Sequence, residues 1–127
     1  MLATQIRRTG AALLAAAGIL HLALVPEYLH EKTYVGLLFV VGGTTAAGAA
    51  ARLWAGHDLR AWTLGGLTAA GMAAGFILSR VTGLPGFHPT DWELSGIVSA
   101  LLEAGFIVAL VRFARLTGLR GAASFTG

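Results

Sequence analysis

The chain has 127 residues, of which 56% are hydrophobic and only 12% are charged, and it contains no cysteine. Soluble domains carry about 25% charged residues, so this composition excludes an ordinary water-soluble domain, and the lack of cysteine excludes disulfides and thiolate metal sites. The formal net charge of +3 does not indicate a nucleic-acid partner, because the basic residues are dispersed at the ends of apolar stretches, where they set topology and contact lipid headgroups.

Four apolar stretches fill most of the chain and are separated by short polar breaks. They cover residues 9–25, 33–54, 61–79 and 94–113. The hydrocarbon core of a bilayer takes about 20 helical residues, and backbone polar groups within lipid must be paired inside the structure. We therefore predict an all-α fold, in which residues 1–127 form a single integral-membrane domain. This domain is a four-transmembrane-helix bundle with short loops and with helices at about 9–25, 26–54, 61–80 and 92–113.

The first stretch has some features of a signal peptide, because Arg7 and Arg8 precede an apolar run. The run continues to Val25, however, and Pro26-Glu27 follows it in place of a small-residue cleavage site. We therefore expect an uncleaved first helix. Proline suits the first turn of a new helix better than a helix interior, so the second helix is expected to begin at Pro26 and to project beyond the membrane.

Charge is distributed unevenly between the two predicted sides of the membrane. One side carries seven basic residues and the other carries two, Lys32 and Arg80. The positive-inside rule places the more basic side, with both termini, in the cytoplasm. The seven are Arg7, Arg8, Arg52, Arg60, Arg112, Arg115 and Arg120.

Small residues recur at a four-residue spacing in the second and third predicted helices. The third contains Gly71 and Gly75, and the second contains Thr44 and Gly48. Close approach through small residues drives helix association in lipid. These positions are expected to pack helices together, either within one bundle or across a homodimer.

Two ionisable residues, His21 and Glu103, lie inside predicted spans. Such residues face the bundle interior and are functional candidates. At about 1.5 Å of rise per residue, their depths allow them to meet if the first helix runs on towards Leu29, and Ser99 lies one turn from Glu103 on the same face. The pair is either a structural hydrogen bond or part of a proton relay or ligand site.

A second group of ligand-type residues lies at the predicted outer side. Glu27, His30 and Glu31 have spacings of three and four and would share one helix face, and Glu27 to His30 is the Glu-x-x-His spacing that di-iron bundles use twice. Imidazole and carboxylate ligands suit zinc, iron, manganese or copper(II). The alternative is a solvated, partly neutralised rim. The other three candidates come from the second outer loop: His88, Asp91 and Glu93.

The chain resembles a group of small bacterial four-span membrane proteins of uncharacterised function. The resemblance rests on His-x4-Pro-Glu at residues 21–27, Ser-Arg-x-x-Gly-Leu-Pro-Gly at residues 79–86 and Trp-Glu-x-x-Gly-Ile-Val-Ser at residues 92–99, followed by Glu103. The position of Tyr28 is often histidine in that group, and this departure weakens a metal site on the first turn. The resemblance implies the same architecture and a bacterial cytoplasmic (inner) membrane, and it supplies no activity.

Three functions follow from these observations. The favoured one is an auxiliary module that binds a transition metal or small ligand at its extracytoplasmic face. The alternatives are a small proton-coupled transporter that uses Glu103 and a structural subunit of a larger membrane complex. An enzyme is the least favoured class, because phosphate loops, dinucleotide fingerprints and Ser-His-Asp patterns are missing from the sequence. The expected partners are the lipid bilayer and a homo-oligomer or larger membrane complex.

Overall fold

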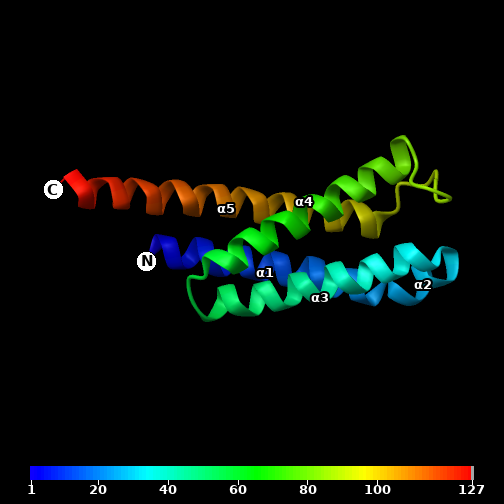
Figure 1. Ribbon diagram of the computed structural model, residues 1–127, viewed down its shortest axis with the longest axis horizontal. Coiled ribbons are helices and arrows are strands. Elements are labelled where there is room, and N and C mark those ends of the chain that lie inside the picture. The colour runs from blue at the N-terminus through cyan, green and yellow to red at the C-terminus, as the bar shows by residue number, and fades with distance from the viewer. Residues whose placement is uncertain (127) are drawn as a thin grey trace.

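The computed structural model describes the backbone of residues 1–126 and the side chains of residues 1–118, and this part of the chain forms five helices (Figure 1). The predicted all-α fold is therefore confirmed. Arg120, one of the seven basic residues counted above, lies outside the described side chains. The helices are α1 (Leu2–Ala23), α2 (Val25–Glu31), α3 (Thr33–Ala55), α4 (Leu59–Val81) and α5 (Leu94–Thr126).

The helices have the length and hydropathy of a multi-pass membrane protein. Helices α3 and α4 and residues Leu94–Gly118 of α5 are each long and apolar enough to cross a bilayer, and α1 with α2 passes the same test as a pair bent by 48°. This gives three candidate spans among the described residues, or four when the bent pair counts as one. Long helices that follow one another run in opposite directions, and both termini lie at the same end (Figure 1), as an even number of crossings requires.

The predicted helix at 26–54 is divided in the structure. Pro26 lies in the first turn of α2, as expected, but Lys32 has extended backbone angles (φ −157°, ψ 113°) and separates α2 from α3. Helix α2 then folds back against α3, where a Cβ at Gly36 would lie 2.6 Å from Leu29. Only a glycine permits this close approach. Helices α1 and α5 also extend beyond their predicted limits at residues 9 and 113.

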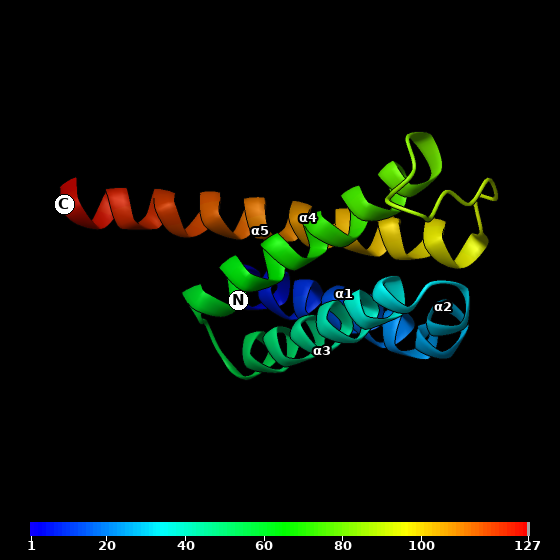
Figure 2. The same cartoon turned by 45° about the vertical axis from the view of Figure 1, so that its right-hand side comes forward.

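The two ends of the bundle differ in packing. We call the end with both termini and the α3–α4 connection the proximal end, and the other end the distal end (Figures 1 and 2). The buried hydrophobic core fills the proximal half, and its largest fully buried hydrophobic side chains are Leu14, Leu53 and Phe106. In both views α4 crosses the bundle at an angle, so its distal end lies farther from α3 than its proximal end.

The predicted small-residue faces do not pack helices of this chain together. A Cβ added at Gly48, Gly71 or Gly75 would meet no atom within 4 Å, and Thr44 is exposed. The close approach occurs instead between α1 and α3, where a Cβ at Gly18 would lie 2.9 Å from the carbonyl oxygen of Gly43. Packing within the bundle was therefore the wrong interpretation of the four-residue spacing in α3 and α4.

Polar groups fix the proximal helix ends. The buried guanidinium of Arg7 donates to the carbonyls of Leu53 and Trp54 in the last turn of α3. At the start of α4, the Asp58 carboxylate accepts a hydrogen bond of 3.2 Å from the Ala61 N–H. This hydrogen bond lowers the pKa of the Asp58 carboxyl from its ordinary value.

We expect Gly18→Ala to destabilise the protein and Gly48→Ala to leave it unchanged or stabilise it. Alanine is favoured over glycine in a helix interior by about 1 kcal/mol, but at residue 18 its Cβ meets backbone atoms of α3, and overpacking of this kind costs about 1–3 kcal/mol. Thermal unfolding in detergent measures both variants. Equal effects at the two positions would contradict the α1–α3 contact.

We expect the destabilisation caused by Asp58→Ala to be greater at pH 7 than at pH 3. The folded-state pKa is depressed, so the carboxylate stabilises the fold above its unfolded pKa of about 3.9, and this contribution is lost as the pH falls through the folded pKa. Unfolding in detergent at the two pH values measures the difference. A pH-independent loss would mean that Asp58 does not act as a charged helix cap.

Candidate functional site

A cavity of about 390 Å³ lies in the distal half of the bundle, and residues from all five helices and the α4–α5 loop line it. Its size falls within the range of small-molecule pockets, about 300–1,000 Å³. Its walls are mainly apolar and aromatic, with Phe39 on α3 and Met72 and Phe76 on α4. The cavity exists because α4 diverges from α3 here, and Gly71 and Gly75 on α4 present no side chain to fill the space.

A cluster of three buried polar side chains borders the cavity: His21 from α1 and Ser99 and Glu103 from α5. Ser99 Oγ donates to Glu103 Oε2 at 2.7 Å and lies 3.3 Å from His21 Nδ1. His21 Nδ1 lies 3.8 Å from Glu103 Oε2. The structure therefore brings together the two residues that the sequence places inside predicted spans, with Ser99 between them.

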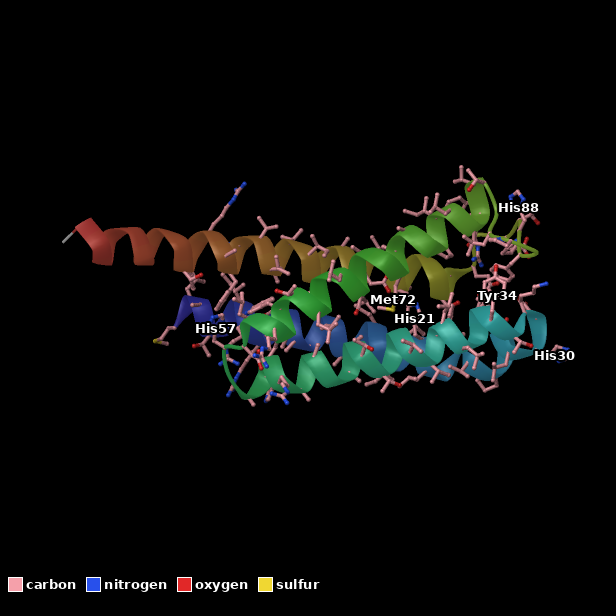
Figure 3. All side chains as sticks on the ribbon, in the orientation of Figure 1. His21, His30, Tyr34, His57, Met72 and His88 are labelled. Carbon is pink, nitrogen blue, oxygen red and sulfur yellow. The ribbon has the colours of Figure 1, made fainter. Side chains whose placement is uncertain are left out.

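The hydrogen bonds of His21 determine which ring nitrogen carries a proton in the neutral imidazole. Nδ1 lies 2.9 Å from the carbonyl oxygen of Ala17, and a carbonyl oxygen only accepts. Nδ1 therefore carries the proton, and the Ser99 oxygen can share it because the Ser99 hydroxyl proton is directed to Glu103. Nε2 is left with a lone pair on a ring that lines the cavity. Figure 3 shows His21 and Met72 in the same region of the bundle.

A second polar cluster closes the distal end of the cavity, and its centre is the buried Arg80 guanidinium at the end of α4. Arg80 Nε donates to the Asp91 carbonyl at 3.0 Å, and one terminal nitrogen donates to Ser79 Oγ at 2.8 Å. The other donates to the Tyr28 hydroxyl at 3.3 Å and to Glu93 at 3.5 Å. The guanidinium also lies 4.5 Å from the centre of the Phe76 ring. The cluster joins α2, α4 and the start of α5.

The α4–α5 loop continues this closure. Pro85 and Gly86 form a tight turn between Leu84 and Phe87, whose backbones exchange two hydrogen bonds of 2.7 and 2.9 Å. Gly86 has φ +65°, a left-handed conformation that favours glycine. Tyr34 on α3 donates to the Pro85 carbonyl at 2.6 Å, so the loop is held across the distal end.

The predicted outer metal ligands do not come together. Glu27, His30 and Glu31 are exposed on α2, whereas Glu93 turns towards Arg80. His30 and His88 lie on different parts of the distal end (Figure 3), and the Asp91 side chain is exposed. Among the described residues, no group of three or more His, Asp or Glu side chains could hold a metal ion. The arrangement fits the alternative of a partly neutralised rim.

Sequence reasoning found the polar cluster and missed the cavity wall. Met72, Gly75, Phe76 and Ser79 all line the cavity, and their spacing of three, four and seven places them on one face of α4. That spacing can be read from the sequence, and it could have indicated that these four residues share a wall of the cavity. The Arg80–Glu93–Tyr28 contacts had only a weak signal, because they join three separate elements.

Comparison with known proteins adds no assignment to this geometry: no protein-family model, curated protein or solved structure matches the chain.

Arg80→Gln is expected to destabilise the protein by about 1.5–3 kcal/mol, the usual size for lost hydrogen bonds to charged groups. The substitution removes the contacts to Tyr28 and Glu93 and leaves the Glu93 carboxylate without its cation. Thermal unfolding in detergent measures the loss. Arg60→Gln, at an exposed position, is the control and should have almost no effect. Equal stability of the two variants would show that Arg80 does not hold the distal end together.

Proposed function

We propose that this chain is a small membrane-embedded binding protein that takes a lipophilic organic molecule into its distal cavity. One observation carries the proposal: an apolar cavity of about 390 Å³ is bordered by the buried polar cluster His21–Ser99–Glu103. Ionisable residues inside spans are costly and mark functional sites. A mostly apolar pocket with a few convergent polar groups is the usual form of a small-molecule site.

The proposed ligand enters from the bilayer. Leu38 and Val41 on α3 and Leu67 on α4 line the cavity and are 58%, 64% and 69% exposed. All three lie within candidate spans, so this side of the cavity borders lipid. A molecule dissolved in the membrane can reach the polar cluster without passing through the closed distal end.

Binding is a better account than transport. A transporter must also open its site towards the other side of the membrane, and the proximal half of this bundle is filled by its core, including the fully buried Leu14, Leu53 and Phe106. Because the outer carboxylates and imidazoles are dispersed, the proposed ligand is organic and not a metal ion. We retain the predicted orientation as part of the proposal, with the distal end on the extracytoplasmic side.

The test compares a cavity-filling variant with a matched control. Gly75→Leu places a side chain in the cavity, whereas Gly48→Leu adds the same atoms to open space elsewhere. Calorimetric titrations use three probes with one skeleton, 4-phenylbutylamine, 4-phenylbutan-1-ol and 4-phenylbutyrate. The protein is held in zwitterionic lipid nanodiscs, and empty nanodiscs correct for partitioning.

We expect saturable binding of at least one probe to the natural chain, weakened about tenfold or more by Gly75→Leu, which corresponds to about 1.4 kcal/mol. Gly48→Leu should bind as the natural chain does. Absence of saturable binding for all three probes, or equal affinities in the two variants, would overturn the proposed function.

A further inference from the structure

We propose that the cavity selects lipophilic organic cations, typified by a protonated alkylamine, and that Glu103 and His21 hold the ammonium group. This inference rests on the proposed function, because it names the ligand class of the same cavity. It depends on the hydrogen-bonding character and the charge of the polar cluster.

The cluster offers acceptors to a ligand. The Ser99 hydroxyl proton is committed to Glu103, and the His21 Nδ1 proton is committed to Ala17 and Ser99. His21 Nε2 has no hydrogen-bond partner among the described residues and keeps a lone pair, and the Glu103 carboxylate contributes acceptor oxygens. An ammonium group has three N–H donors and no acceptor, so it complements this surface.

The charge of the cluster also favours an ammonium group as the ligand. In the described part of the chain, no Lys or Arg nitrogen lies within 4.0 Å of Glu103, and the contact of 3.8 Å to His21 is a charge pair only if the imidazole is protonated. An ionised carboxylate inside the membrane is costly unless it is paired, and a nearby cation would stabilise it. A ligand ammonium supplies that cation while His21 remains neutral and accepts an N–H.

Aromatic rings suit the rest of such a ligand. The Phe39 ring lies 4.7 Å from the His21 ring and 4.4 Å from the Tyr28 ring, measured between centroids, and all three residues line the cavity. A cation held within about 6 Å of an aromatic ring centre is attracted to the face of that ring. The apolar walls of α3 and α4 can then accommodate a hydrocarbon or aromatic tail.

Among the described residues that line the cavity, an anion would find no free cation. Arg80 also lines it, but the guanidinium is bonded to Ser79, Tyr28, Glu93 and the Asp91 carbonyl. Glu93 balances its charge at 3.5 Å. A ligand carboxylate or phosphate would have to displace these contacts and would also face the Glu103 carboxyl.

The three probes named above decide this inference, because they differ only in the terminal group. In the natural chain we expect 4-phenylbutylamine to bind about tenfold or more tightly than 4-phenylbutan-1-ol, since hydrogen bonds to charged groups exceed neutral ones by roughly this factor. The carboxylate, 4-phenylbutyrate, should bind most weakly. Glu103→Gln should reduce the affinity for the amine to that for the alcohol and leave the alcohol almost unchanged.

Controls separate this inference from the proposed function. Glu31→Gln removes one exposed acidic charge and should preserve the preference for the amine. If Glu103→Gln does not fold, the ranking of the three probes on the natural chain still decides. Equal or tighter binding of the alcohol or the carboxylate would overturn the cation preference, and the proposed function would stand if Gly75→Leu abolished that binding. Binding of none of the probes would overturn both.

Discussion

The distal half of this bundle is organised around one buried group, the Glu103 carboxyl. It lies within the candidate span of α5 and is only 1% exposed, and an acidic residue at the centre of a membrane helix costs about 2.5–3.5 kcal/mol on insertion scales. Ser99 one turn away and His21 on α1 lie beside it. The same contacts align α1 with α5 and direct the remaining acceptors of the cluster towards the cavity.

The proximal half of the bundle is packed, whereas the distal half contains the cavity that we propose binds a ligand. In the proximal half, small residues bring the helix backbones close, as at Gly18 and Gly43, and aromatic stacking of Trp62 with Phe106 and Phe113 fills the core. In the distal half, α4 turns away from α3 (Figure 2) and leaves a cavity that the Arg80 cluster closes at the end. A packed half and an open half are therefore combined within five helices.

The sequence predicted most of the fold and part of the site, for identifiable physical reasons. Apolar length and the need to pair backbone groups in lipid predict helices, and depth along two helices was enough to suggest that His21 and Glu103 meet. Other features depend on contacts between separate elements: the break at Lys32, the angle of α4 and the pairing of Glu93 with Arg80. Residue spacing along one helix does not report such contacts. For the same reason, the spacing of Gly71 and Gly75 did not predict that these residues line a cavity.

Nitrogen NMR of histidine-labelled protein in nanodiscs tests the central claim most directly, with His21→Gln used to assign the His21 signals. We expect a neutral His21 imidazole with the proton on Nδ1 and a bare Nε2, and we expect 4-phenylbutylamine to shift the Nε2 resonance as an N–H bond forms. A proton on Nε2 in the free protein, or His21 signals that do not respond to saturating amine, would contradict the proposed binding of an ammonium group at His21 and Glu103.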